Sequence, residues 1–164
     1  MIAIIKYNAG NVRSVQNAVS RLGYKSVITS NKAEIIKADK VIFPGVGEAS
    51  SAMQYLKAYG LDDVIKTLNQ PVLGICLGLQ LMCTSSEEGN TPCLDIFKTK
   101  VIRFPNLDIV PHMGWNTMRV LKPNILTETI SECDDMYFVH SYYAEVCNET
   151  LSECNYITPF SAIL

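Results

Sequence analysis

The stretch Leu73-Gly74-Ile75-Cys76-Leu77-Gly78-Leu79-Gln80 decides the fold, because it joins a short apolar run to the first turn of a helix. Gly74 and Gly78 stand two residues either side of Cys76, which gives the pattern Gly-x-Cys-x-Gly. This is the cysteine form of the nucleophile elbow, in which the nucleophile occupies a strained turn between a strand and a helix. The two glycines predict that the strand and the helix pass closely beside that turn.

The chemistry predicted at Cys76 is nucleophilic. A helix that begins just after the cysteine directs its free N–H groups and the positive end of its dipole toward the sulfur. We therefore expect the thiolate to be favoured and the pKa of Cys76 to be lowered. The alternative is a buried structural cysteine flanked by two incidental glycines, since unpaired cysteines are often buried.

The composition predicts one ordinary globular domain of 164 residues, with 48% hydrophobic and 18% charged residues. A net charge of −2 gives no general attraction to nucleic acid or to anionic membranes. Neither a membrane-spanning apolar run nor a signal segment is found in the sequence, so we expect a cytoplasmic protein. Six scattered cysteines without a Cys-x-x-Cys pair, and two histidines, predict reduced thiols and no metal site.

Strands and helices alternate in the first half of the chain. We expect strands at residues 1–5, 25–29, 40–43 and 72–75, and helices at 12–22, 32–37 and 48–67, the last with a break near Gly60. Such alternation predicts a parallel sheet with helices on both faces and an active site beyond the carboxyl ends of its strands. Residues 100–104, 115–121, 136–143 and the segment from 156 predict a largely antiparallel second half.

Several motifs together resemble the class I (triad) glutamine amidotransferases. They are the elbow, Pro44-Gly45-Val46-Gly47 and Ser86-Glu87-Glu88-Gly89. The segments 8–11, 111–116 and 137–142 narrow the resemblance to the glutaminase subunits of imidazole glycerol phosphate synthases. The resemblance runs in order along the chain and implies a single flavodoxin-like amidotransferase domain over residues 1–164.

The resemblance implies that the protein hydrolyses L-glutamine to glutamate and ammonia through a thioester on Cys76, without a cofactor. It also implies a partner, a (β/α)8-barrel cyclase subunit. That partner would use the channelled ammonia to make imidazole glycerol phosphate and AICAR in histidine biosynthesis. A paralogue that supplies ammonia for the amidation of sugars is an alternative.

The resemblance also implies roles for individual residues. The oxyanion hole would be formed by Gly45, Val46 and Leu77. Glutamine would be held by Gly47, Gln80, Glu88, Ser141 and Tyr142, and the partner would be met by Asn11, Trp115 and Asn116. The residues alone leave blander readings open: a strand-ending turn, a helix-surface glutamine, a solvated acidic loop and packed aromatic strands.

The family's catalytic base is a histidine in a His-Pro-Glu motif, and the 164 residues contain no such motif. We therefore interpret the chain as truncated at its C-terminus relative to the family, with an exposed sheet edge as a consequence. The alternatives are that His112 or His140 has taken over the role of base, or that the chain is a non-catalytic subunit that only binds its partner.

Overall fold

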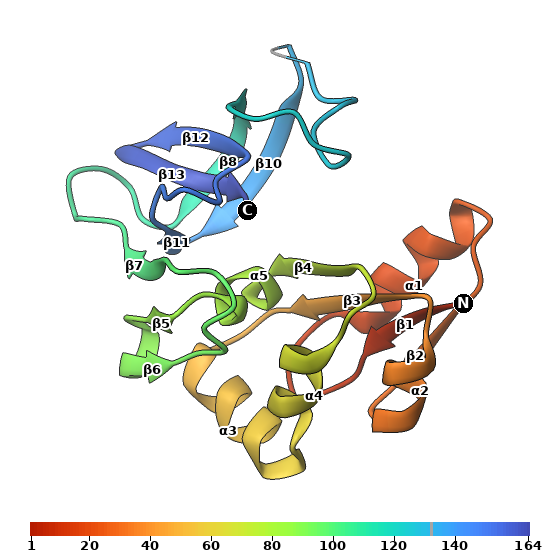
Figure 1. Ribbon diagram of the computed structural model, residues 1–164. Helices are drawn as coiled ribbons and strands as arrows, with labels where there is room; N and C mark the ends of the chain where they lie inside the picture. The colour runs from red at the N-terminus through yellow and green to blue at the C-terminus, as the bar shows by residue number, and fades with distance from the viewer. Residues whose placement is uncertain (132) are drawn as a thin grey trace.

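The computed structural model describes residues 1–131 and 133–164 and divides them between a parallel α/β layer and a set of mainly antiparallel strands (Figure 1). The helices are α1 (Val12–Arg21), α2 (Lys32–Lys37), α3 (Ala49–Tyr59), α4 (Leu61–Thr67), α5 (Leu77–Met82) and the 3-10 helix η1 (Glu88–Asn90). None of these helices, within the part of the chain that is described, is long and apolar enough to cross a membrane.

The parallel sheet has the strand order β2-β1-β3-β4. Its strands are β1 (Ile2–Ile5), β2 (Ser26–Thr29), β3 (Lys40–Gly45) and β4 (Val72–Cys76). Central strand β1 buries Ala3, Ile4 and Ile5 completely, which confirms the strand predicted from its unbroken apolar run. Successive side chains alternate between the faces: Ile5 packs with α3 and α4, and Ile4 packs with α1.

The helix boundaries follow from local capping. The side-chain oxygen of Asn31 accepts hydrogen bonds from the N–H groups of Ala33 and Glu34 and so begins α2. Gly60 ends α3 and precedes α4 with φ 60°, a left-handed conformation that glycine adopts without a Cβ clash. The break predicted near Gly60 is confirmed.

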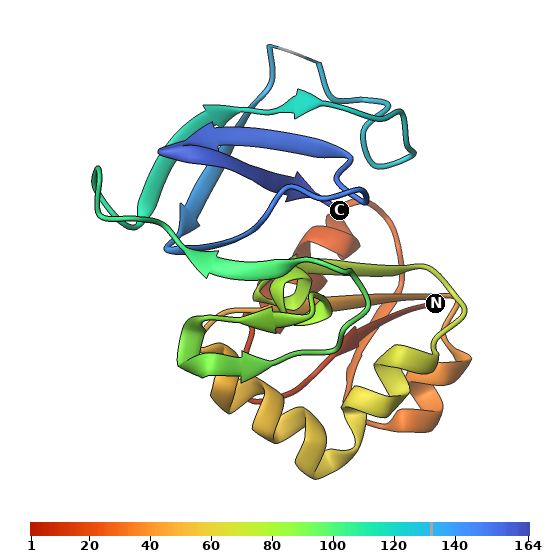
Figure 2. The same cartoon turned by 60° about the vertical axis from the view of Figure 1, so that its left-hand side comes forward.

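The second half forms a seven-stranded sheet of order β6-β5-β7-β11-β13-β12-β9 and a two-stranded ribbon of β10 and β8. The strands are β5 (Ser85–Ser86), β6 (Thr91–Pro92), β7 (Lys100–Arg103), β8 (His112–Thr117), β9 (Arg119–Val120), β10 (Asp135–His140), β11 (Tyr142–Ala144), β12 (Ser152–Tyr156) and β13 (Thr158–Ile163). In both views the C-terminal strands, coloured blue, lie on one side of the parallel sheet, above β4 and α5 (Figures 1 and 2).

For this half, one prediction is corrected and one strand was missed. The strand expected at 136–143 is interrupted at Ser141, so that β10 and β11 belong to different sheets. Strand β10 pairs with β8 and strand β11 pairs with β7, so the chain changes direction between them. The composition of residues 136–143 does not reveal these pairing partners. Strand β12 was not predicted, because its polar and mixed sequence shows no apolar run.

Strand β4 lies at an edge of the parallel sheet. Its side chains Leu73 and Ile75 are exposed on that edge, at 42% and 38%. The expectation of an exposed sheet edge is therefore confirmed for the residues described.

Candidate active site

Cys76 occupies a strained backbone position at the junction of β4 and α5. Its φ of 54° and ψ of −115° are unusual for a residue with a side chain, and such conformations cost of the order of 1–3 kcal/mol. As a whole residue, Cys76 is exposed. The elbow is thus present as the sequence predicted, with the helix beginning at Leu77, directly after the cysteine.

The elbow glycines are required by close packing. A Cβ on Gly78 would lie 1.8 Å from the carbonyl oxygen of Phe43 in β3. A Cβ on Gly74 would lie 2.8 Å from the Met82 sulfur and 2.9 Å from the Leu79 Cα. The absence of side chains at these two positions lets α5 pack directly against β3 and β4.

The Pro44–Gly47 turn follows β3 and lies beside the elbow. Gly45 is directly opposite Cys76 in the β3–β4 pairing, and a Cβ on Gly45 would lie 2.8 Å from the Leu77 Cβ. Gly47 has φ 114° and Val46 is exposed at 56%. The backbone that could supply oxyanion donors from both segments is therefore gathered around the thiol.

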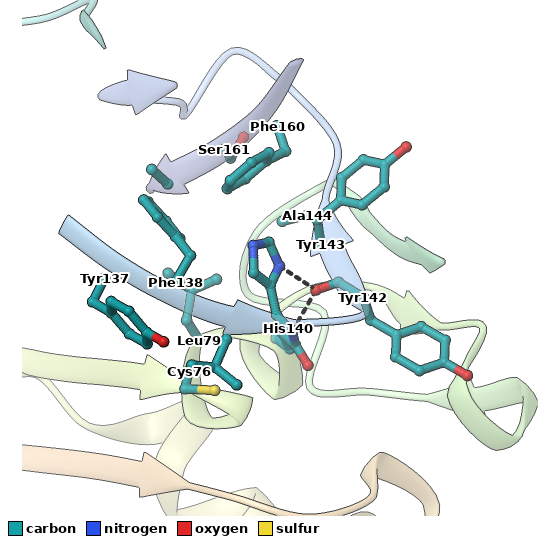
Figure 3. A pocket seen from close by; sticks show the side chains of 13 residues that line it. Cys76, Leu79, Tyr137, Phe138, His140, Tyr142, Tyr143, Ala144, Phe160 and Ser161 are labelled. Carbon is teal, nitrogen blue, oxygen red and sulfur yellow. Dashed lines mark hydrogen bonds between the residues drawn. The ribbon is translucent and has the colours of Figure 1, made fainter. Parts of the chain in front are cut away.

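One open cavity of about 520 Å³ gathers most of the predicted site residues. Its lining includes Val46, Gly47, Cys76, Leu77, Gln80, Glu88, Ser141 and Tyr142. An adjoining cavity also borders Cys76 and is walled by β10, β11 and β13 (Figure 3). Of the residues predicted to act on glutamine, only Gly45 is absent from the lining, because it is buried beneath the turn.

Gln80 and the chain around Tyr142 are hydrogen-bonded to each other. The Gln80 Nε2 donates to the Tyr142 carbonyl oxygen at 3.0 Å, and the Nδ1 of His140 lies 2.9 Å from the same oxygen (Figure 3). This shared acceptor ties the nucleophile helix α5 to the junction between β10 and β11.

Glu88 projects from η1 toward the start of α3. Its Oε2 accepts the Ala49 N–H at 2.8 Å, and its own N–H donates to the Ser86 hydroxyl at 3.1 Å. No partner within residues 1–131 and 133–164 is found for Oε1. Glu88 therefore carries a negative charge at the rim of the Cys76 cavity with one carboxylate oxygen available.

The expectation of a lowered pKa at Cys76 is wrong. Desolvation by the surrounding protein raises the pKa of the thiol, the N–H of Leu77 opposes this by hydrogen bonding, and the negative charge of Glu88 raises the pKa further. The N–H of Leu77, at the start of α5, lowers the pKa less than burial raises it. The resting chain therefore favours the thiol over the thiolate.

His112 and His140 form a hydrogen-bonded pair rather than a base for Cys76. The Nδ1 of His140 faces the Tyr142 carbonyl oxygen, so this nitrogen carries the proton. The other ring nitrogen of His140, Nε2, therefore accepts a hydrogen bond from the His112 Nδ1 at 3.1 Å. His112 is stacked between Phe138 and Tyr156, and burial lowers the pKa of both histidines. Neither His140 nitrogen keeps a free lone pair, so the geometry does not support its replacing the family's base.

The residues predicted to meet a partner lie on different surfaces. Trp115 is 71% exposed on the β8–β10 ribbon and packs edge-to-face on Tyr137. Asn116 points to the opposite face and donates to the Asn155 carbonyl at 3.0 Å. The side-chain oxygen of Asn11 accepts the Ser14 N–H and begins α1.

Two features of the site were not predicted from the sequence. They are the histidine pair and Tyr7, whose hydroxyl lies against Gly45. The position of Tyr7 just beyond β1, at the carboxyl end of the parallel sheet, was the available signal, because ligand sites occur at that edge. No group of three or more metal-ligating side chains occurs among the residues described.

Comparisons with known proteins give the family. The sequence model of "Glutamine amidotransferase class-I" matches residues 3–162. The chain is 55% identical, over 99% of its length and 84% of the relative's, to "Imidazole glycerol phosphate synthase subunit HisH" of Bacteroides thetaiotaomicron. It is 45% identical, over 99% of its length and 83% of the relative's, to the protein of the same name from Pasteurella multocida.

Solved structures share the fold. A crystal structure of a glutamine amidotransferase matches 92% of this chain and 78% of its own, with a TM-score of 0.72 and 17% identity. A GMP synthase-type protein from Thermoplasma acidophilum matches 93% of this chain and 72% of its own, with a TM-score of 0.68 and 14% identity. The predicted α/β fold of the amidotransferase type is thereby confirmed. The chain belongs to the class I glutamine amidotransferases.

Proposed function

We propose that this chain is the glutaminase subunit of an imidazole glycerol phosphate synthase and hydrolyses L-glutamine to glutamate and ammonia. The 55% identity with a HisH subunit over nearly the whole chain carries this proposal. A cysteine held on an elbow beside a glycine-rich turn supports the chemistry. Residues 1–164 are proposed to form a single amidotransferase domain.

The reaction follows from covalent catalysis at Cys76. The sulfur attacks the side-chain amide carbon, a C–S bond forms, the C–N bond breaks, and the thiol proton leaves with ammonia. Water then adds to the thioester, releasing glutamate and returning a proton to the sulfur. Both steps balance without a cofactor.

The proposed oxyanion hole consists of the N–H of Leu77 and an N–H from the Gly45–Val46 segment. The direct opposition of Gly45 and Cys76 supports this assignment, since it places both segments beside the sulfur. One such donor is typically worth about 3 kcal/mol in the transition state.

Recognition of glutamine is proposed to use the rest of the cavity lining. The carboxylate of Glu88 would pair with the α-ammonium group, and the backbone at Ser141 and Tyr142 would hold the α-carboxylate. Gln80 and Gly47 would shape the pocket between them. The hydrogen bond from Gln80 to Tyr142 supports this grouping, because it fixes two of the proposed contacts relative to each other.

The partner is proposed to be a (β/α)8-barrel cyclase subunit like HisF, which receives the ammonia and makes imidazole glycerol phosphate and AICAR. The exposed apolar face of the ribbon, formed by Met113, Trp115, Tyr137 and Val139, supports a docking surface beside the site. All six cysteines are free, which suits a reducing compartment, and we propose that the protein acts in the cytoplasm.

The test is glutamate release with and without the barrel subunit, comparing the chain with Cys76→Ala. We expect release by the unmodified chain in the complex and none by the variant. Because the sequence contains no His-Pro-Glu run, the assay is repeated with any coding sequence found after Leu164 included. Absence of release from both forms in the complex would favour the non-catalytic binding subunit.

A second assay tests the nucleophile directly. A glutamine-like diazo-ketone is expected to label Cys76 in preference to the other five cysteines, of which Cys83 and Cys154 are buried. Equal labelling of all six thiols would contradict the elbow assignment. Activation by a sugar-amidating partner instead of the cyclase would assign the chain to a paralogous pathway.

A further inference from the structure

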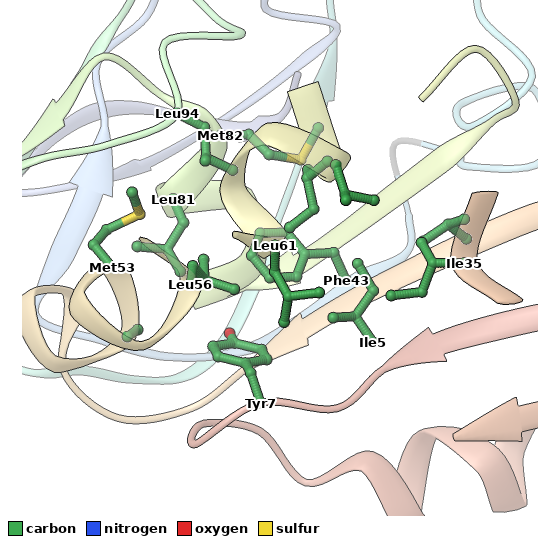
Figure 4. Packing of buried hydrophobic residues seen from close by; sticks show 14 of the residues in the cluster. Ile5, Tyr7, Ile35, Phe43, Met53, Leu56, Leu61, Leu81, Met82 and Leu94 are labelled. Carbon is green, nitrogen blue, oxygen red and sulfur yellow. The ribbon is translucent and has the colours of Figure 1, made fainter. Parts of the chain in front are cut away.

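Tyr7 holds a buried hydroxyl without a described partner. The residue is 8% exposed and its ring packs against Phe43 at a centroid distance of 5.4 Å. Its hydroxyl oxygen is buried and finds no hydrogen-bond partner in the part of the chain that the structure describes. Figure 4 shows this side chain at one end of the buried cluster, near Leu56, Leu61 and Phe43. An unsatisfied buried hydroxyl is unfavourable, so its position calls for a physical reason.

The hydroxyl lies directly against the turn that borders the nucleophile. A Cβ on Gly45 would lie only 2.5 Å from the Tyr7 hydroxyl oxygen. Gly45 is paired with Cys76 in the sheet, and its other near neighbours are the Leu77 Cβ and the Gly78 nitrogen. Tyr7 therefore lies against the proposed oxyanion segment from within the hydrophobic core.

The geometry of a peptide bond connects the core with the cavity. In a planar trans peptide the N–H and the C=O point in opposite directions. If the Val46 N–H points into the cavity to meet the oxyanion, the Gly45 carbonyl must point away from it, toward the protein interior. A carbonyl turned inward requires a donor, and a neutral tyrosine hydroxyl can supply one.

We propose that Tyr7 is a positioning residue for glutamine hydrolysis: its hydroxyl, unpaired in the described structure, donates to the Gly45 carbonyl when the Val46 N–H faces the oxyanion and so holds that N–H in place. The inference rests on the proposed function, because it assigns a task within that reaction. Burial raises the pKa of Tyr7, so the hydroxyl stays protonated and able to donate.

The experiment compares Tyr7→Phe with the unmodified protein in the complex with the barrel subunit. The variant removes one oxygen and keeps the ring. We expect kcat for glutamine to fall about tenfold while KM and the Kd of glutamate stay within about twofold, because the lost hydrogen bond acts only on the transition state. The matched control is Tyr59→Phe, which removes a hydroxyl from a residue that is 58% exposed at the end of α3.

Two further measurements separate positioning from general damage. The maximal rate of inactivation by the diazo-ketone should fall with kcat, since its carbonyl uses the same donors. Alkylation of Cys76 by iodoacetamide, which needs no oxyanion hole, should keep its rate. The thermal midpoint of Tyr7→Phe should equal or exceed that of the unmodified protein, because an unpaired buried hydroxyl is removed.

The outcomes are distinct. Full kcat and full inactivation rate in Tyr7→Phe would overturn the proposal and leave Tyr7 as a packing residue. Equal losses in kcat and iodoacetamide reactivity would also overturn it, because the hydroxyl would then act on the thiol. If the unmodified complex neither releases glutamate nor reacts with the diazo-ketone, the proposed function itself fails.

Discussion

The contact between α5 and β3 predicts a large effect for Gly78→Ala. The new Cβ would lie 1.8 Å from the Phe43 carbonyl oxygen and 2.8 Å from its carbonyl carbon. Both are backbone atoms, which cannot rotate away as the end of a flexible side chain can. To bring the closer contact to 3.0 Å, the two backbones must separate by roughly 1.2 Å.

That separation would affect both stability and catalysis. Forcing an extra methyl group into a packed interior costs about 1–3 kcal/mol. The same movement would displace the Leu77 N–H from the Gly45–Val46 segment, and a misplacement of about 1 Å in an active site can lower the rate about 100-fold. We therefore expect a lower free energy of unfolding and a kcat reduced about 100-fold in folded protein.

The assay is urea unfolding combined with glutamate release in the complex. Gly114→Ala in β8 is the control, since it adds the same methyl group where no atom lies within 4 Å. If Gly78→Ala unfolds at the same urea concentration as the unmodified protein and keeps its kcat, the elbow does not require the close approach of α5 to β3.

Three further predictions concern recognition, docking and pH. Glu88→Gln should raise the KM for glutamine about tenfold with little change in kcat. The variant loses the negative charge that pairs with the α-ammonium group but keeps an oxygen that can accept the Ala49 N–H. An unchanged KM in steady-state assays would count against this role. Trp115→Ala should weaken barrel binding by about 2 kcal/mol in calorimetry and leave the thermal midpoint unchanged, since the side chain is 71% exposed; equal affinity would place the interface elsewhere. Burial raises the pKa of Cys83 to about 12 in the folded protein. As the pH rises above about 9, the Cys83 thiol therefore ionises in the unfolded chain before it ionises in the folded protein, and the free energy of unfolding should decrease. In urea titrations at about pH 8 and pH 10, Cys83→Ala should show a smaller decrease than the unmodified protein, and an equal decrease would assign the effect to other groups.

Much of the parallel half could be predicted from sequence, because its signals are local. The run before Lys6, the cap at Asn31 and the left-handed turn at Gly60 each depend on neighbouring residues alone. The elbow was also predictable, because its two glycines are required by close contacts with residues a few positions away and with the adjacent strand.

The features that escaped prediction depend on distant contacts. The pKa of Cys76 is set by desolvation and by Glu88, which approaches from another element and opposes the expected helix effect. The histidine pair exists only because β8 and β10 align His112 with His140. The interruption at Ser141 depends on the pairing of β10 with β8 and of β11 with β7. The aromatic sequence of residues 136–143 does not specify these partners.

This split has a mechanical consequence. Ser141 is the only residue between β10, which carries the Tyr137 side of the exposed ribbon, and β11, which begins with Tyr142. A tilt of the ribbon would therefore pivot about this joint and shift the Tyr142 carbonyl, carrying the Gln80 amide with it. The joint is one residue long, and the β10 side chains Phe138 and His140 pack on Phe160, so pressure applied outside at Tyr137 would reach the groups around the sulfur through both the backbone and the hydrophobic interior.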